Sequence, residues 1–259
     1  MTNLIIYEQP VYENIRNFLK CEYINEKFIS SFANNNLWGI KVSILALIEM
    51  AEFNSRYNLK VDLIMDLEKK ILYLKELKKN NSITEAKYIF YQSEIKKCLL
   101  NLLKIKFNPS KTVNNNDFLM SIKHKFYITA GGNFFDMPSL LSFLTSKRSS
   151  IKTLIKLWYE PFEVICESCL LSLDIKRSTS PFLRCTSNFS FYSQKLTKNF
   201  IDLVRVKVLT DKNIFPDISA NSKNVNIIFK ELYKNENNGI LSRAIDDNFI
   251  FEIALCGLN

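Results

Sequence analysis

The sequence PFEVICESCLLSLDIKRSTSPFLRC, from Pro161 to Cys185, separates two kinds of hydrophobic pattern in this chain. Pro161 is expected at the first turn of a helix, and Lys176 and Arg177 are expected at its C-terminus, where the helix dipole favours cations. After Pro181 the helical pattern ends. The apolar stripe of the expected helix consists of Phe162, Ile165, Cys166, Cys169, Leu170 and Leu173.

Upstream of Pro161 the sequence predicts further helices that each bury one face. Apolar residues recur at i, i+4, i+7, i+8 and i+11 from Ile40 to Ala51. A second stripe consists of Ile64, Leu67, Ile71 and Leu74, with Lys69, Lys70 and Lys75 expected on other faces. Further helices are expected at about 84–105, at 117–125 and from Pro138 onward, the last one capped by Asp136.

Downstream of Pro181 the apolar residues alternate with polar ones, as in half-buried strands. Turn-rich loops are expected near 193–199 and 235–247. We therefore predict an α+β protein, with an N-terminal all-helical domain (residues 1–180) followed by a small antiparallel β-rich domain (residues 181–259). The alternating residues are Val204, Val206 and Val208, then Val225, Ile227 and Phe229, and finally Phe249, Phe251, Ile253 and Leu255.

Composition places the chain among ordinary globular proteins. Of its 259 residues, 47% are hydrophobic and 24% are charged, which allows a sizeable core. No apolar run approaches the roughly 18 residues that span a bilayer, and the chain begins with a polar, acidic stretch. We expect a cytoplasmic protein without membrane insertion. The net charge of +9 permits an anionic partner, although codon bias toward Lys, Asn and Ile would also raise it.

The six cysteines are expected to be reduced, buried thiols, because most lie in apolar runs. Cys166 and Cys169 form a C-x-x-C pair, but a zinc site needs two more ligands, and the only histidine, His124, has no matching spacing. We expect neither a metal nor a cofactor.

No pattern in the chain indicates catalysis. With only five glycines, neither a dinucleotide-binding nor a phosphate-binding loop can be written, and Gly131–Gly132 is expected to form a turn with positive φ. His124 is expected on an exposed helical position. The carboxylate pairs Asp62/Asp66 and Glu163/Glu167 are expected on solvated helix faces. We therefore expect that the protein is not an enzyme.

Five collinear segments resemble the ZapD family of bacterial division factors that bind FtsZ. They are YEQPVYENIRNFLKCEYI (7–24), FYITAGGNFFDMPSLLSFL (126–144), PFLRCTSNFSFYSQ (181–194), IFPDISANSK (214–223) and FIFEIALC (249–256). The resemblance implies a symmetric homodimer at the mid-cell division ring. In it, each protomer takes the C-terminal tail of FtsZ in a basic pocket, and the dimer cross-links protofilaments.

The resemblance also implies which residues form the pocket. Asp117, Asn224 and Ile228 depart from the basic residues of relatives, which would weaken the pocket or redistribute its charge. An alternative function is a basic nucleic-acid-binding module, although the aromatic residues fall on apolar stripes instead of interleaving with lysines. The tail-binding residues implied by the resemblance are Arg56, Lys60, Lys123, Lys125, Arg177, Arg184 and Lys223.

Overall fold

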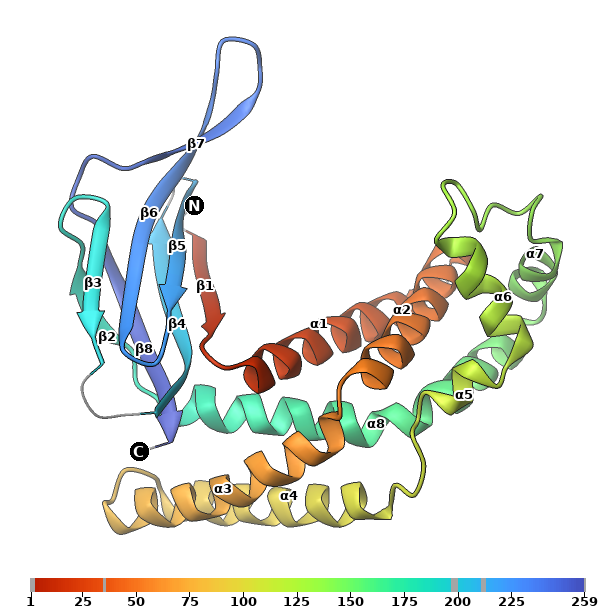
Figure 1. The fold of residues 1–259 in the computed structure, drawn as a ribbon, viewed down its shortest axis with the longest axis horizontal. Coiled ribbons are helices and arrows are strands. Elements are labelled where there is room, and N and C mark those ends of the chain that lie inside the picture. Colours follow the sequence, from red (N-terminus) through yellow and green to blue (C-terminus); the bar gives the residue numbers. More distant parts are fainter. Residues whose placement is uncertain (1–2, 35, 197–199, 211–212, 259) are drawn as a thin grey trace. The chain divides into compact units, whose positions relative to one another are not determined.

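The computed structural model describes residues 3–34, 36–196, 200–210 and 213–258. It confirms the α+β class, because helices precede antiparallel strands along most of the chain (Figure 1). The helices are α1 (Glu13–Ala33), α2 (Leu37–Arg56), α3 (Leu59–Lys79), α4 (Glu85–Lys104), α5 (Lys111–Asn114), α6 (Asp117–Phe126), α7 (Pro138–Thr145) and α8 (Arg148–Thr179). The strands are β1 (Asn3–Pro10), β2 (Leu183–Thr186), β3 (Phe191–Lys195), β4 (Phe200–Thr210), β5 (Ile214–Ala220), β6 (Asn224–Lys234), β7 (Ile240–Ala244) and β8 (Ile250–Leu258).

The chain forms two compact units, each assembled from separate segments. The helical unit comprises Asn17–Leu74 and Thr84–Leu173. The β-rich unit comprises Met1–Arg16, Lys75–Ile83 and Asp174–Asn259. The N-terminal strand and the C-terminal strands therefore belong to the same unit.

Helix α2 follows the predicted pattern closely. Its stripe from Ile40 to Ala51 is buried, and α5, α6 and α7 all contact this helix. Its start is fixed by Asn36, whose side-chain oxygen accepts a hydrogen bond from the backbone N–H of Gly39 at 2.6 Å. In Figure 1, α1 and α2 run side by side within the helical unit.

The expectation that Asp66 and Lys70 lie on solvated faces of α3 is wrong. Lys70 is 0% exposed and Asp66 is 5% exposed. The Lys70 ammonium donates hydrogen bonds to the Asp66 carboxylate and to the Ser172 hydroxyl of α8, and Ser172 donates to Asp66 at 2.6 Å. The pair can be buried because α8 supplies a third polar group, which no pattern within α3 reveals.

Two expectations about proline and capping need correction. Pro161 does not begin a helix but lies inside α8, because the buried stripe already starts upstream with Ile151 and Ile155. Pro138 is the first residue of α7, as predicted. Asp136, however, does not cap α7: Met137 is the N-cap residue, and the Asp136 carboxylate instead accepts a hydrogen bond from Asn133 at 2.5 Å.

The β-rich unit contains two antiparallel sheets, where the sequence predicted one. The first has the strand order β1-β4-β8-β2, and the second has the order β3-β6-β5, with β7 also paired to β6. Their core includes Val206, Ile227, Phe229 and Phe251. The prediction of a loop at 193–199 is wrong for its first residues, because β3 extends to Lys195. Residues 197–199 of that prediction lie outside the described residues. The loop expected at 235–247 contains β7.

Strand β1 was not predicted, although it completes the first sheet. It pairs with β4 along its whole length, and Tyr7 lies opposite Val206. The Glu8 carboxylate accepts hydrogen bonds from Arg205 at 2.8 Å and from Arg177 at 2.6 Å. These bonds tie the N-terminal strand to β4 and to the end of α8.

All six cysteines are free thiols, and five of them are buried. Cys21 of α1 lies 4.0 Å from Cys166 of α8, measured between the sulfur atoms, and burial helps to raise the pKa of both thiols. Within the described ranges, no group of three His, Cys, Asp or Glu side chains could hold a metal ion. None of the described helices combines the length and apolarity that a bilayer span requires.

Candidate functional site

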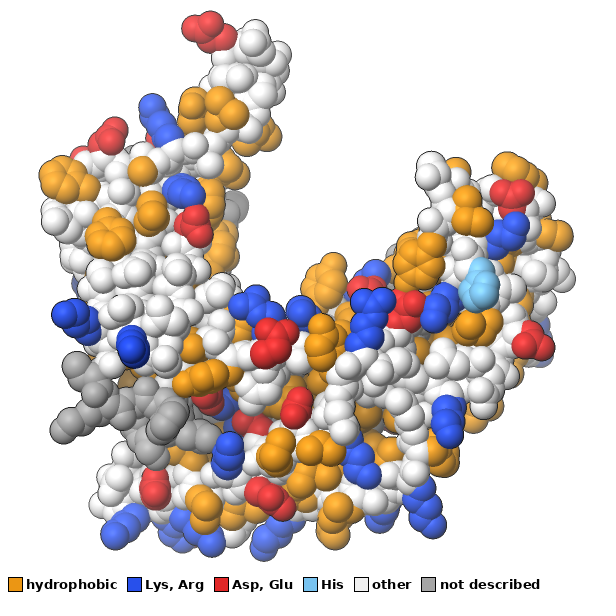
Figure 2. All heavy atoms as spheres, viewed as in Figure 1, with side chains coloured by type: hydrophobic (Ala, Val, Ile, Leu, Met, Phe, Trp, Pro, Cys, Tyr) orange, Lys and Arg blue, Asp and Glu red, His pale blue; other side chains and the backbone are white. Residues whose placement is uncertain are grey.

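A cavity of about 860 Å³ lies on the surface of the helical unit where α1, α2 and α6 meet. We call it the α1–α2 groove. Figure 2 shows charged and hydrophobic side chains gathered together over these helices. Ile24, Ile48 and Phe53 are buried beneath it, and the rings of Tyr23, Phe126 and Tyr127 stand exposed around it. The other lining residues are Lys20, Lys27, Val42, Leu45, Glu49, Glu52, Arg56, Tyr57 and Lys123.

Helix α2 supplies one complete side of the groove. Val42, Leu45, Glu49, Glu52 and Arg56 lie at i, i+3, i+7, i+10 and i+14, so they share a face of this helix. The stripe begins apolar and ends charged. A bound segment that lies along α2 would therefore meet apolar side chains at one end and charges at the other.

The side chains that line the groove have a net positive charge. Its lining contains four cations, Lys20, Lys27, Arg56 and Lys123, and two carboxylates, Glu49 and Glu52. Lys27 lies 2.8 Å from Glu49, and Lys123 lies 3.1 Å from Glu52. The four cations and two carboxylates leave an excess of two positive charges to attract an anionic ligand.

Glu52 sits at the centre of a small hydrogen-bonding network. One carboxylate oxygen contacts Lys123, and the other accepts a hydrogen bond from the Tyr127 hydroxyl. Burial alone would raise the pKa of Glu52, but the bonds from Tyr127 and Lys123 and the nearby charge of Arg56 lower it. The same bond to Glu52 is the main reason that the pKa of Tyr127 is raised to about 12.

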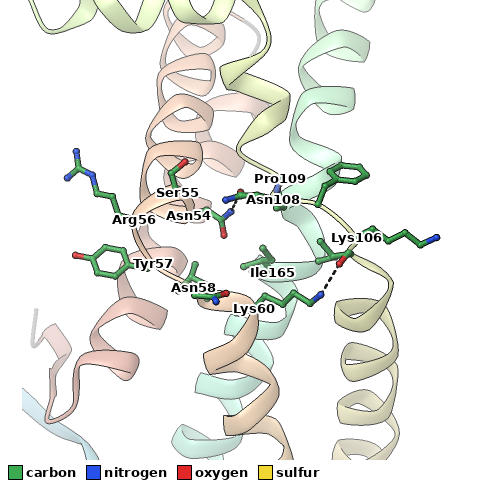
Figure 3. A pocket seen from close by; sticks show the side chains of 13 residues that line it. Asn54, Ser55, Arg56, Tyr57, Asn58, Lys60, Lys106, Asn108, Pro109 and Ile165 are labelled. Carbon is green, nitrogen blue, oxygen red and sulfur yellow. Dashed lines mark hydrogen bonds between the residues drawn. The ribbon is translucent and has the colours of Figure 1, made fainter.

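Arg56 is the groove cation best placed to receive a ligand. It lies exposed in the last turn of α2, where the helix dipole favours a cation. With the residues that the structure describes, it forms neither a hydrogen bond nor an ion pair within 4 Å. Arg56 also lines the neighbouring cavity between α2, α3 and α4, but Figure 3 shows its guanidinium directed away from the other labelled side chains of that cavity. Its five guanidinium donors are therefore available to a carboxylate.

That neighbouring cavity, of about 440 Å³, contains Lys60. The Lys60 ammonium donates a hydrogen bond to the carbonyl of Ile105, the C-cap residue of α4, at 2.8 Å (Figure 3). Beside it, Asn54 donates to the Asn108 side chain at 2.8 Å. Lys60 is thus engaged in joining α3 to the end of α4, which satisfies a carbonyl that the helix leaves unpaired.

The diglycine turn positions the end of α6, which carries Lys123 and Lys125. Gly132 has φ +84°, as predicted for this turn. The Lys41 ammonium donates to the carbonyl of Gly132 at 2.6 Å and lies over the rings of Trp38 and Phe134. This contact holds the turn against α2. Lys125 lies exposed on α6, as does His124, which was predicted.

The remaining predicted site residues belong to the β-rich unit. Arg177 is paired with Glu8. Arg184 of β2 lines a cavity of about 500 Å³ together with Lys207 and Glu252, which form an ion pair at 2.6 Å. Lys223 is exposed at the turn before β6, and its backbone N–H donates to Asn221 at 2.8 Å.

Two of the three departures also have a local explanation. Asp117 lies in the first turn of α6, where the helix dipole favours a carboxylate. Asn224 is the first residue of β6 and lies opposite Lys195 of β3, so a basic residue at this position would place two like charges opposite each other. Ile228 is 37% exposed on the same strand, and nothing in the structure explains its replacement of a basic residue.

The α1–α2 groove thus brings together two of the seven predicted residues, Arg56 and Lys123. Sequence reasoning missed Lys27, Tyr127 and the two glutamates as groove residues. A signal for Lys27 was present, because Lys20, Tyr23, Ile24 and Lys27 recur at i, i+3, i+4 and i+7 on α1. Tyr127 lies in one of the segments that carried the family resemblance.

A family model for ZapD, described as a cell division protein, matches residues 19–228. The match includes α2, α6 and the whole α1–α2 groove, and it continues through β5 into β6. It spans well over half of the 259 residues. This chain therefore belongs to the ZapD family of cell division proteins.

Proposed function

We propose that this protein is a cytoplasmic division factor that binds the C-terminal tail of FtsZ. In this proposal it acts as a homodimer that cross-links FtsZ protofilaments at the mid-cell ring. The observation that carries the proposal is the α1–α2 groove, in which an apolar floor lies beside the available guanidinium of Arg56. A short segment with apolar and acidic side chains would satisfy both parts of this surface.

Among the predicted residues, Arg56 and Lys123 are the ones we propose as direct tail contacts. Lys125 would contribute at longer range from the exposed surface of α6. Lys60 and Arg177 already bind a backbone carbonyl and a carboxylate of this chain, which favours a structural role for both. Arg184 and Lys223 would offer further anion contacts on the β-rich unit.

Cross-linking follows from valency once the tail is bound. A disordered tail loses conformational freedom on binding, so a single contact should be weak. A dimer that holds two tails gains effective concentration on a polymer that displays many of them. No enzymatic step is needed in this mechanism, and nucleotide turnover by the purified protein without FtsZ would contradict that part of the proposal.

The groove suits a peptide better than a nucleic acid. Glu49 and Glu52 line it, and their carboxylates would repel a phosphate backbone. A peptide can place backbone amides near these carboxylates and its own carboxylate near Arg56. The glutamates therefore favour the peptide over the nucleic-acid alternative.

The decisive experiment uses FtsZ with and without its C-terminal tail. We expect the purified protein to sediment with polymerised FtsZ, to bundle it in light scattering, and to do neither with tail-less FtsZ. Analytical ultracentrifugation of the protein alone should give the mass of a dimer. Equal sedimentation with tail-less FtsZ would refute tail capture, and a monomer at the bundling concentration would refute cross-linking by a dimer.

A further inference from the structure

We propose that Glu52 is an internal stand-in for a ligand carboxylate, which an acidic residue of the partner peptide displaces from Lys123 and Tyr127. Glu49 plays a smaller part of the same kind at Lys27. The inference rests on the proposed function, because it concerns the same groove and the same peptide. It adds that two glutamates of this chain set how tightly, and for how acidic a segment, the groove binds.

The first support is the geometry around the Glu52 carboxylate. Lys123 and the Tyr127 hydroxyl each contact one of its oxygens, and the positive charge of Arg56 lowers its pKa further. Two donors and a nearby guanidinium around one carboxylate constitute a preformed carboxylate site. The site is occupied by a residue of the chain itself, at the edge of an open groove.

The second support is that the groups come from different elements. Glu52 and Glu49 belong to α2, whereas Lys123 and Tyr127 belong to α6 and the turn after it, and Lys27 belongs to α1. Rotation of the Glu52 side chain would release both donors without breaking a backbone hydrogen bond. The exchange replaces one carboxylate by another, so Lys123 keeps an anionic partner and the Tyr127 hydroxyl keeps an acceptor.

The two glutamates differ in how deeply their ion pairs are buried, which is the third support. The side chains of Lys123 and Glu52 are 23% and 20% exposed, whereas those of Lys27 and Glu49 are 36% and 43% exposed. Charges interact more strongly where water is partly excluded. Glu52 should therefore oppose an incoming carboxylate more than Glu49 does.

The test measures the affinity of a fluorescent synthetic peptide with the sequence of the FtsZ C-terminal tail. We expect Glu52→Gln to tighten binding about three- to tenfold at low salt, because one negative charge leaves a partly buried site. Glu49→Gln should tighten it about twofold. The matched control is Glu26→Gln, which makes the same change at an exposed position of α1 outside the groove and should have little effect.

Two further measurements separate displacement from a general charge effect. In a Lys123→Gln background, Glu52→Gln should no longer tighten binding, because the cation that it frees is gone. With a peptide whose Asp and Glu residues are replaced by Asn and Gln, the effect of Glu52→Gln should also vanish. An equal gain in the Lys123→Gln background would overturn the proposal, since it would show that Glu52 acts only through long-range charge. An equal gain with the neutral peptide would also overturn it, because displacement requires a carboxylate on the ligand.

Failure of this inference can be distinguished from failure of the proposed function. If wild-type protein binds the tail but Glu52→Gln leaves affinity unchanged or weaker, the stand-in role is refuted while tail binding stands. If no variant binds the tail, the proposed function fails, and the inference fails with it. Should Glu52→Gln not fold, Tyr127→Phe replaces it: binding should weaken if the hydroxyl passes to the ligand, and unchanged binding would refute the transfer.

Discussion

The charge reversal Arg56→Glu tests the groove most directly. It changes the lining from four cations and two carboxylates to three of each, so the positive excess of two disappears. A unit charge near a ligand carboxylate in a solvent-exposed site contributes about 0.5–1 kcal/mol, so reversal should cost about 1–2 kcal/mol for each nearby carboxylate. We therefore expect roughly five- to thirtyfold weaker binding of one tail.

Bundling should respond more steeply than single-tail binding. A cross-link needs both sites of a dimer occupied at once, so its yield follows about the square of the occupancy when binding is weak. Peptide anisotropy measures the first quantity, and sedimentation of FtsZ bundles measures the second. The matched control is Lys96→Glu, an equal reversal at an exposed position of α4 outside the described cavities. Equal binding by Arg56→Glu and Lys96→Glu would refute our assignment of Arg56.

Three other predictions concern salt, the core and the diglycine turn. Raising salt from about 0.05 to 0.5 M shortens the Debye length from roughly 14 to 4 Å, so tail binding should fall and bundling should fall further; salt-independent bundling would contradict electrostatic capture. Asp66→Asn should lower the free energy of unfolding by about 3–5 kcal/mol in urea, because it leaves the buried Lys70 ammonium without its carboxylate; a change below about 1 kcal/mol would contradict this account of the buried pair. Gly131→Ala should destabilise more than Gly132→Ala, because its Cβ would lie 1.9 Å from the Lys125 carbonyl oxygen, whereas alanine at Gly132 meets mainly the cost of about 1 kcal/mol for positive φ. Equal thermal midpoints of the two alanine variants would contradict this reading of the turn.

Helices α2, α3, α4, α6 and α7 were predictable because their signal is local, whereas α1 and α5 were not predicted. The stripe from Ile40 to Ala51 follows from the period of the helix, and the structure buries this stripe against neighbouring apolar residues. Pro161 shows the limit of the same reasoning. A proline is favoured in a first turn, but the upstream residues Ile151 and Ile155 continue the buried stripe, and this packing decides where α8 begins.

The polar residues were less predictable, because a charge in a sequence does not reveal its partner. Lys60, Arg177 and Arg56 look alike as basic residues in the sequence. In the structure Lys60 donates a hydrogen bond to a carbonyl at the end of a helix, and Arg177 forms an ion pair with Glu8. Arg56 forms neither kind of contact with the described residues. These partners come from distant segments of the chain. Lys70 illustrates the same point inside the core, because its burial depends on Ser172, about a hundred residues away in the sequence.

Strand β1 has a consequence for how this protein is made. Tyr7 lies opposite Val206, so β1 pairs with a strand whose facing residue is synthesised 199 residues later. At about 5–20 residues per second, the chain must wait roughly 10–40 s before that partner exists. During this interval Leu4, Ile5 and Ile6, which remain partly exposed even in the folded sheet, belong to an unpaired apolar segment. Strand β1 therefore remains without its partner until most of this sequence has been synthesised, which makes its apolar residues the ones that depend most on protection from aggregation in that interval.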